Sequence, residues 1–277
     1  MSKKMSNFEL VAFDMDGTLL NSKKEIPAET LKYIKKARNS GKIVCLSTGR
    51  SIPELKVFGD ELSDIRYFIA VSGAVLYDNF ADRIIEFHAL EEKTVLDLFD
   101  VVKNQDVMIQ LHSNNSVVEK NKLNAIDEYN MGVFKPVFEK IALKPENLLE
   151  FYKKEKFPVY KLNFYLRTLE EREPLRKKIL DRNIPVNLVN SEITSLECSP
   201  PGISKGFGLE VLCRKIGLPV SKTIAVGDAD NDLEILKKAG LSVAMGNANE
   251  NVKKIADVVV KDNDNGGTGQ VIEEFLL

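Results

Sequence analysis

Short apolar runs alternate with amphipathic segments over the first third of the chain. The runs FELVAF, KIVCLST and YFIAVSGA are uninterrupted, and apolar residues recur at helical spacing through residues 26–41 between the first two. Pro27 stands near the start of that segment and Gly41 at its end, as is typical of helix boundaries. Because continuous apolar strands joined by helices are typical of a parallel sheet covered on both faces, the pattern predicts an α/β fold.

The last third of the chain repeats this pattern, and the middle departs from it. SKGFGLEVLCRKIG, DNDLEILKKAG and TGQVIEEFLL are expected helices, and TIAVGD, LSVAM and DVVV are expected strands. In the middle, the β-type runs VMIQLHS and VYKLNFYL alternate polar and apolar positions and lie between charged helices. We therefore expect a Rossmann-like core in two parts, residues 1–82 and 190–277, with a separate α/β domain inserted at 83–189.

Length, net charge and cysteine content limit the classes of protein to which this sequence can belong. A chain of 277 residues is long enough for two domains. The net charge of -2 gives no excess that would favour nucleic acid or an anionic membrane as a partner. The three cysteines are scattered without disulfide or zinc spacing, and no run approaches a membrane span. We expect a cytoplasmic protein, with His88 and His112 in ordinary structural or surface roles.

The stretch LVAFDMDGTLL ends an apolar strand with two carboxylates, Asp14 and Asp16. Like charges so close shift each other's pKa unless something positive lies between them. A strand-end aspartate can attack phosphorus, and a second one can protonate the leaving oxygen and then deprotonate water. The alternative is an acidic turn between a strand and a helix, which the DxDGT sequence after the strand makes less favourable.

Two further motifs suit the binding of a phosphoryl group. In LSTGR, the hydroxyl of Thr48 and nearby backbone N–H groups such as that of Gly49 stand at a strand end before a helix. In SPPGISKG, Lys205 stands at an expected helix start, where its ammonium could hold the negative charge of Asp14 and of a phosphate. Taken alone, the first motif is more typical of a plain turn with an N-cap hydroxyl, and Lys205 is one lysine among many.

The stretch GDADNDLEIL gathers acids directly after another apolar strand. Asp228 follows the strand, and Asn231 and Asp232 follow within a few positions. Oxygen donors of this kind select Mg²⁺, whereas the spacing of an EF-hand calcium loop is absent. The alternative is a helix N-terminus enriched in acids for its dipole. Together with Asp14, these residues predict a site at the carboxyl ends of parallel strands.

In order and spacing, these motifs resemble the haloacid dehalogenase-like phosphohydrolases, and within them the Cof-type sugar phosphatases. The resemblance rests on FDMDGTLL, LSTGR, SPPGISKG, VGDADND and SVAMGNANENVK, which span nearly the whole chain. It implies a Rossmann-like core with a large α/β cap inserted after the third core strand. The expected insert at residues 83–189 matches that position.

The same resemblance implies a role for each matching residue. It makes Asp14 the nucleophile and Asp16 the general acid and base. It implies phosphoryl binding by a group of four residues, Thr48, Gly49, Lys205 and Asn231. It also implies that Mg²⁺ is held by Asp14, the backbone carbonyl of Asp16, and Asp228, with Asp232 in support. Two positions depart from the family pattern: Ser72 stands where relatives often have asparagine, and Ala229 where many have glycine.

The predicted activity is that of a Mg²⁺-dependent phosphatase acting through an aspartyl-phosphate. Sugar phosphates, pyridoxal phosphate and flavin mononucleotide are the implied substrates, and the cap is expected to select among leaving groups, with Arg167, His112 and Asn114 as candidate contacts. We expect a monomer or weak homo-oligomer acting on a small phosphorylated metabolite. A phosphomutase, a receiver-type signalling protein, and a binding protein without turnover remain alternatives.

Overall fold

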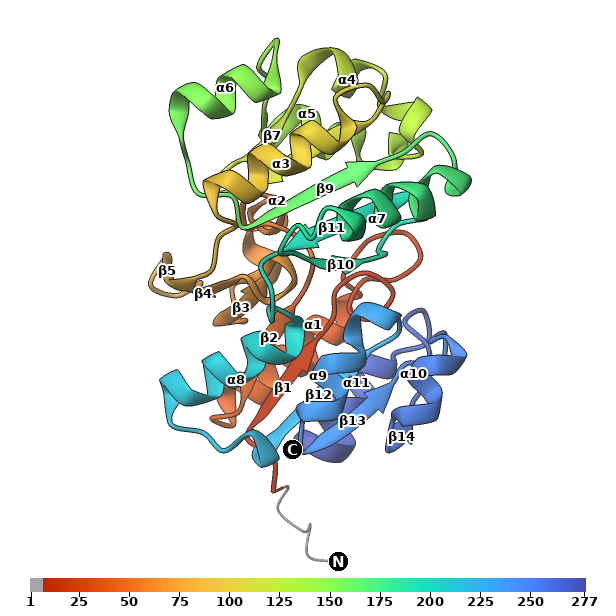
Figure 1. Ribbon diagram of the computed structural model, residues 1–277. Helices are drawn as coiled ribbons and strands as arrows, with labels where there is room; N and C mark the ends of the chain where they lie inside the picture. Colours follow the sequence, from red (N-terminus) through yellow and green to blue (C-terminus); the bar gives the residue numbers. More distant parts are fainter. Residues whose placement is uncertain (1–6) are drawn as a thin grey trace, which may run out of the picture. The chain divides into compact units, whose positions relative to one another are not determined.

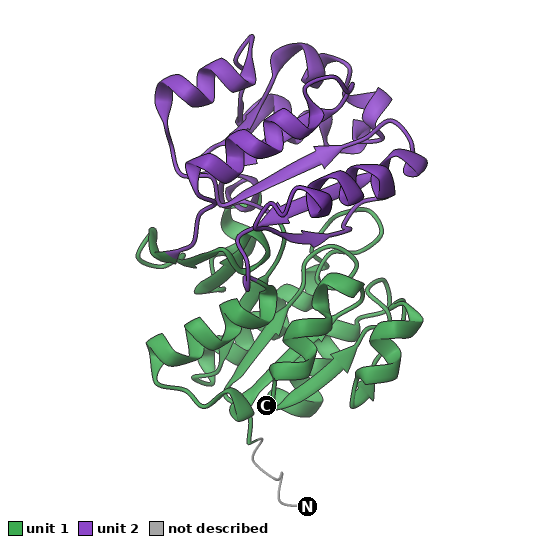
Figure 2. Cartoon of the chain, in the orientation of Figure 1, with its two compact units in different colours: residues 1–49, 58–86, 204–277 green, residues 50–57, 87–203 purple. Residues whose placement is uncertain are grey.

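The computed structural model describes residues 7–277 as two compact units (Figures 1 and 2). Unit 1 is formed by the described residues up to Gly49, by residues 58–86 and by residues 204–277. Unit 2 is formed by residues 50–57 and 87–203. Within the described part of the chain, no helix has both the length and the apolar character needed to cross a lipid bilayer.

Unit 1 is built on a mostly parallel sheet with strand order β14-β13-β12-β1-β2-β3-β4-β5. The strands are β1 Leu10–Phe13, β2 Ile43–Ser47, β3 Tyr67–Ala70, β4 Val75–Asp78, β5 Arg83–Phe87, β12 Thr223–Gly227, β13 Leu241–Ala244 and β14 Val258–Val259. Pairing is parallel from β14 to β3, and β4 runs antiparallel to β3. The central strand β1 is buried along its whole length, as its uninterrupted apolar sequence predicts.

Helices flank this sheet in two groups (Figure 1). One group is α1 Ala28–Asn39, α11 Gly267–Val271 and the π-helix η8 Ile272–Leu276; the other is α8 Lys205–Ile216, α9 Leu233–Lys238 and α10 Glu250–Ile255. Short 3-10 helices are η1 Gly59–Leu62, η2 Val71–Gly73, η6 Val220–Lys222 and η7 Asp230–Asp232. The α/β class expected from the apolar pattern is confirmed, with helices near the positions that the sequence predicts.

Unit 2 has its own sheet, with strand order β10-β11-β9-β6-β7-β8. Its strands are β6 Met108–His112, β7 Ser116–Val118, β8 Ala142–Leu143, β9 Lys161–Tyr165, β10 Asn187–Val189 and β11 Ser195–Ser199. Its helices are α2 Ile52–Lys56, α3 Glu92–Val102, α4 Lys120–Asn124, η3 Ile126–Tyr129, η4 Gly132–Phe134, α5 Lys135–Ile141, α6 Leu148–Glu155, η5 Leu169–Glu171 and α7 Arg172–Asp181. Pairing is antiparallel except between β7 and β8.

The boundaries of unit 2 differ from the insert expected at residues 83–189. The unit extends to residue 203 because β11 pairs with both β9 and β10 in its sheet. It also includes residues 50–57, which carry the short helix α2 and lie outside the expected insert. The runs with alternating polar and apolar residues in the middle region form strands of the unit 2 sheet. Residues 50–57 have no such pattern, so their place in unit 2 could not be predicted from it.

Candidate active site

Two adjacent parallel strands bring the first acid pair and the acid cluster to one edge of the unit 1 sheet. Asp14 follows β1 and Asp228 follows β12, and Phe13 is in register with Val226. The backbone N–H of Asp14 donates to the carbonyl of Val226 at 3.0 Å, which continues the pairing past the strand end. Because the strands are parallel, both carboxylates leave the sheet at its carboxyl edge.

A buried lysine joins two of the carboxylates. Lys205 is the first residue of α8, whose N-cap Ser204 accepts from the N–H of Phe207. Its Nζ donates to Asp14 Oδ1 at 2.5 Å and to Asp232 Oδ1 at 2.6 Å. Burial by itself lowers the pKa of the Lys205 ammonium, but the charges of the two carboxylates outweigh it and raise that pKa above its usual value. Lys205 is therefore a fixed positive charge beside Asp14.

Asp232 is held through both of its carboxylate oxygens. Oδ1 accepts from Lys205, and Oδ2 accepts from the backbone N–H groups of Asp228 at 3.0 Å and Ala229 at 3.2 Å. The side chain is almost completely buried. Asp232 therefore fixes the loop after β12 onto the start of α8, which suits a supporting role for this residue.

Asp228 is oriented by the loop that follows Asp14. Thr18 Oγ1 donates to Asp228 Oδ1 at 2.8 Å. Gly17 has φ of +85°, and a Cβ at this position would lie 2.4 Å from Asp228 Oδ2. The glycine is therefore required both by its left-handed backbone and by the close approach of the carboxylate.

The carboxylates of Asp14, Asp228 and Asp232 form a group that fits a cation. One oxygen from each lies within 4.8 Å of the others. Burial raises the pKa of Asp14 well above its usual value; Lys205 opposes this, and the two other carboxylates add to it. Burial likewise raises the pKa of Asp228 to about 6, against the hydrogen bond from Thr18. A hard divalent cation such as Mg²⁺ offsets crowding of this kind and prefers these oxygen donors.

Asn231, the amide residue of the acid cluster, also has an atom that suits a bound ligand. Asn231 belongs to η7, between Asp230 and Asp232. Its Oδ1 is buried and accepts no hydrogen bond within the described structure. A buried amide oxygen of this kind calls for a partner, either a bound cation or a hydrogen-bond donor.

Asp16 differs from Asp14 in being partly exposed and in having an ion-pair partner that the sequence analysis did not identify. Lys24 Nζ lies 2.9 Å from Asp16 Oδ1. The Lys24 backbone is left-handed, with φ of +62°, in a turn whose Asn21 Oδ1 accepts from two backbone N–H groups. No motif marks this lysine, because its approach depends on the local turn.

Thr48 and Ser72 are joined through the backbone. The Thr48 N–H donates to the carbonyl of Ile69, and the Thr48 carbonyl accepts from the N–H of Ser72, both at 2.9 Å. Ser72 is left-handed, with φ of +56°. The next residue, Gly73, packs so closely that a Cβ there would lie 2.0 Å from the Ser204 carbonyl. The Thr48–Gly49 turn and the start of α8 are thus brought to the same region of unit 1.

Asparagines in the stretch GNANENVK also support the loops of the site, a role that was not predicted from the sequence. Asn247 Nδ2 donates to the Gly17 carbonyl at 2.8 Å. The backbone N–H of Asn249 donates to the Asp228 carbonyl at 3.0 Å. The density of asparagines so close to the acid cluster was the available signal, because such side chains commonly satisfy loop backbone groups.

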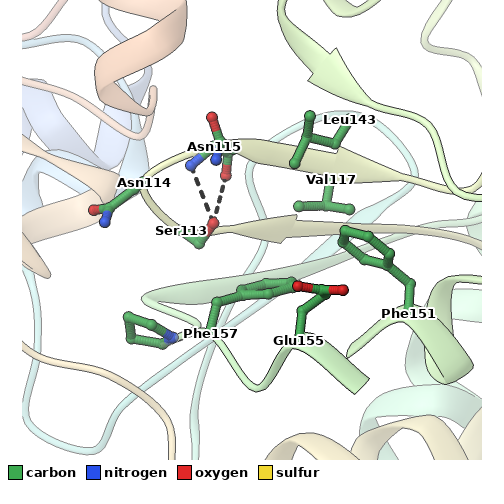
Figure 3. Close-up of a pocket in the computed structure, with 9 residues that line it drawn as sticks. Ser113, Asn114, Asn115, Val117, Leu143, Phe151, Glu155 and Phe157 are labelled. Carbon is green, nitrogen blue, oxygen red and sulfur yellow. Dashed lines mark hydrogen bonds between the residues drawn. The ribbon is translucent and has the colours of Figure 1, made fainter. Parts of the chain in front are cut away.

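The candidate contacts in unit 2 lie in separate surroundings. Arg167 pairs at the surface with Asp106 and Glu128. Asn114 accepts from the Tyr160 hydroxyl at 2.7 Å. Asn114 also lines a cavity of about 250 Å³, shown in Figure 3 with Ser113, Asn115, Val117, Leu143, Phe151, Glu155, Phe157 and Pro158. His112 is buried elsewhere, among the polar side chains of the sheet.

Comparison with known proteins identifies the family of the chain. The sequence model of haloacid dehalogenase-like hydrolases matches residues 11–272. The 5-amino-6-(5-phospho-D-ribitylamino)uracil phosphatase YcsE of Bacillus subtilis is 29% identical over 274 residues, covering 98% of this chain and 97% of the relative. Phosphatase YwpJ of the same organism is 26% identical over 291 residues, covering 97% and 100%.

The fold comparison gives the same family. The solved structure of a haloacid dehalogenase-like hydrolase from B. subtilis has a TM-score of 0.85 at 27% identity, covering 96% of this chain and 99% of that one. The resemblance predicted from the motifs is confirmed, because the family model spans nearly the whole chain. The chain therefore belongs to the haloacid dehalogenase-like hydrolases and is an enzyme of their phosphatase type.

Proposed function

We propose that the enzyme hydrolyses small phosphomonoesters through an aspartyl-phosphate on Asp14, with Mg²⁺ as its cofactor. The observation that supports this most is the position of Asp14. It stands at the carboxyl edge of the sheet, in contact with the buried ammonium of Lys205 and grouped with two further carboxylates. This arrangement offers one carboxylate oxygen to an electrophile while positive charge stands beside it.

In the first step, an oxygen of Asp14 attacks the phosphorus atom and the bond from phosphorus to the leaving oxygen breaks. Asp16 donates a proton to that oxygen, so the leaving group departs as an alcohol. Loss of this proton leaves Asp16 as a carboxylate, the form that the Lys24 ammonium stabilises at 2.9 Å from Oδ1. The product of this step is phosphorylated Asp14.

In the second step, Asp16 accepts a proton from water as the water oxygen attacks phosphorus. The bond between phosphorus and Asp14 breaks, inorganic phosphate leaves, and the Asp14 carboxylate is restored. Asp16 ends the step protonated and ready for the next substrate. One residue thus acts as acid and then as base, as microscopic reversibility requires.

Binding of the phosphoryl group is proposed for Lys205, the Thr48 hydroxyl, the Gly49 N–H and the Asn231 amide. Lys205 stabilises negative charge that grows during transfer. Mg²⁺ would be held by Asp14, the backbone carbonyl of Asp16, and Asp228, where it supplies positive charge to the phosphoryl oxygens. Asp232 supports both groups by fixing Lys205 and the loop after β12. Ser72 is proposed to position Thr48 through its backbone hydrogen bond.

The proposed substrates are small phosphorylated metabolites of the sugar phosphate, pyridoxal phosphate or flavin mononucleotide class. YcsE, which aligns over 98% of this chain, is named for a phosphoribitylamino compound. We propose that unit 2 selects the leaving group, because the phosphoryl-binding residues named above all belong to unit 1. The three cysteines have buried, free thiols, which supports a reducing, cytoplasmic setting.

The decisive experiment measures phosphate release from p-nitrophenyl phosphate with Mg²⁺ and with a chelator. Wild type should turn over only with the metal, and Asp14→Asn should abolish turnover. Asp60→Asn, an exposed acid in the same unit, is the control and should behave as wild type. Turnover that survives Asp14→Asn would contradict the nucleophile assignment. A phosphomutase would instead yield a second phosphorylated isomer from a sugar phosphate, detectable by ³¹P NMR.

A further inference from the structure

Residues 14–20, here called the Asp16 turn, contain both acids of the first motif. Within this turn, the N–H of Leu19 donates to the Asp14 carbonyl at 3.2 Å, and the N–H of Leu20 donates to the Met15 carbonyl at 2.8 Å. These bonds close the turn on its inner side. Its other backbone groups need partners as well, and several of those partners come from distant parts of unit 1.

Asn263 holds the Asp16 turn at two points. Its Nδ2 donates to the Leu20 carbonyl at 2.8 Å. Its backbone N–H donates to Asn247 Oδ1 at 3.2 Å, and Asn247 Nδ2 in turn donates to the Gly17 carbonyl at 2.8 Å. Through one direct bond and one relayed bond, Asn263 therefore holds the backbone on both sides of Thr18.

Asp264, the next residue, holds the chain just beyond the Asp16 turn. Its Oδ1 accepts from the backbone N–H of Ser22 at 2.8 Å. Ser22 lies in the turn that Asn21 stabilises and from which the ammonium of Lys24 reaches Asp16 Oδ1 at 2.9 Å. The side chain of Asp264 thus anchors the segment that brings Lys24 to Asp16.

Both supporting residues belong to a firmly structured loop, residues 262–265, here called the closing loop. Asp262 Oδ1 accepts from the backbone N–H groups of Asp264 at 3.0 Å and Asn265 at 2.8 Å. The Asp262 carbonyl accepts from the N–H of Gly267 at 3.1 Å. A side chain that bonds to the backbone of its own loop fixes the conformation of that loop. The closing loop is therefore a rigid support.

The position of the Asp16 turn matters to two groups of the site. One is the Asp16 carboxyl, and the other is the Thr18 hydroxyl, which donates to Asp228 Oδ1 at 2.8 Å. Groups that take part in catalysis must be held within about 0.5 Å of their productive position. A misplacement of about 1 Å can lower the rate by about 10²-fold. Hydrogen bonds to the backbone on both sides of Thr18 restrict movements of this size.

We propose that Asn263 and Asp264 are positioning residues for the proton transfers of Asp16. They act through the backbone of residues 17–22 and through Lys24, rather than by contact with the reacting atoms. They hold the Asp16 carboxyl where it donates a proton to the leaving oxygen. The proposal rests on the phosphatase function above and adds to it a loop that follows the last strand of the sheet.

The test uses Asn263→Leu, which removes the amide donor at similar size, and two esters that differ only in the nitro group of the leaving phenol. Phenyl phosphate has the more basic leaving oxygen, so its cleavage depends more on the proton from Asp16. We expect kcat/KM for phenyl phosphate to fall about tenfold, and its ratio to kcat/KM for p-nitrophenyl phosphate to fall about threefold or more. An unchanged ratio would overturn the proposal.

Asn79→Leu is the matched control within unit 1. Asn79 Nδ2 also donates to backbone carbonyls, those of Leu62 at 3.1 Å and Ile65 at 3.0 Å, but it has no contact with the Asp16 turn. Both variants should lower the urea midpoint to a similar degree, and only Asn263→Leu should change the ratio of the two esters. An equal change of the ratio in Asn79→Leu would assign the effect to lost stability and contradict a positioning role.

A second pair of variants keeps the test decisive if Asn263→Leu fails to fold. Asp264 is exposed, so its substitution is compatible with folding. Asp264→Ala removes the acceptor for Ser22 and should lower the ratio, whereas Asp264→Asn keeps an acceptor oxygen and should retain it. Equal falls in both would show that the charge matters and not the hydrogen bond, which would refute the proposal. Absence of Asp14-dependent turnover of both esters in the wild type would instead refute the phosphatase mechanism.

Discussion

Unit 1 and unit 2 each contain a buried lysine that is paired with acidic side chains, but the paired residues lie in different kinds of structural element. Lys205 meets Asp14 and Asp232, which come from loops at strand ends and from a helix start. Lys161 meets Glu197 from the interiors of two paired strands. At a strand end, free backbone N–H groups can share the charge, as they do at Asp232. Inside a strand those groups are used by the sheet, so the side chains must satisfy one another.

The largest effect is expected from Lys205→Met. Removal of the ammonium leaves Asp14 and Asp232 buried without their shared cation. The free energy of unfolding should fall by about 3–5 kcal/mol, and kcat should fall by about 10²–10³-fold. Urea denaturation and aryl phosphate turnover measure the two losses. Lys237→Met, which breaks only the exposed pair with Glu234, is the control and should change stability by less than about 1 kcal/mol.

The corresponding change in unit 2 is Lys161→Met, which removes the ammonium that lies 2.8 Å from the buried Glu197 carboxylate. Its free energy of unfolding should also fall by about 3–5 kcal/mol. Here, unlike in unit 1, the second change Glu197→Gln should restore much of the loss, because it removes the buried negative charge. No recovery in the double variant would show that the pair is not energetically isolated.

A smaller effect tests the close packing at the carboxylate cluster. Gly17 and Gly41 both have left-handed backbones, but a Cβ at Gly41 would meet nothing within 4 Å. Alanine at either position therefore adds backbone strain of about 1–2 kcal/mol. Gly17→Ala should lose about 1–3 kcal/mol more than Gly41→Ala, because its Cβ collides with Asp228. Thermal or urea unfolding of the two variants gives the difference, and equal losses would contradict it.

The smallest effect is a pH dependence of stability that comes from the buried His112 of unit 2. Burial and Lys161 lower the pKa of His112 below its usual 6.5. Below pH 6.5 the unfolded chain binds a proton that the native ring resists, so this contribution to stability is complete above pH 6.5 and falls as the pH decreases. The slope reaches at most about 1.4 kcal/mol per pH unit. His112→Gln should flatten this slope in urea titrations, and His88→Gln should retain it.

The proposed catalytic residues could be singled out in the sequence because a strand that ends in an acid leaves a recognisable pattern. An apolar run that stops at an acid marks both the element and the edge where the side chain emerges, as for Asp14 and Asp228. Lys205 was predictable for a similar reason, since a Pro-Gly turn and a helix start precede and follow it. The α/β class followed from the same runs.

The buried polar residues on the strands of unit 2, such as His112, Lys161 and Asn163, could not be predicted in this way. Alternating polar and apolar residues along a strand ordinarily indicate a face exposed to solvent. His112 was expected to have a structural or surface role because it stands apart in the sequence from other metal-ligand residues. Burial of the polar side is a tertiary property with no local signal. The ion pair of Lys24 with Asp16 was missed for a related reason, because it depends on a left-handed turn.

The membership of residues 50–57 in unit 2 has a consequence for engineering and for evolution. The chain passes between the units four times, at 49/50, 57/58, 86/87 and 203/204. A chimera that exchanges only residues 87–203 with a relative would join a foreign sheet to the native α2 and its Glu54. Exchange of unit 2 between members of the family therefore requires two segments to be transplanted together. Sequence changes in residues 50–57 and in residues 87–203 should therefore constrain each other, because the two segments belong to the same unit.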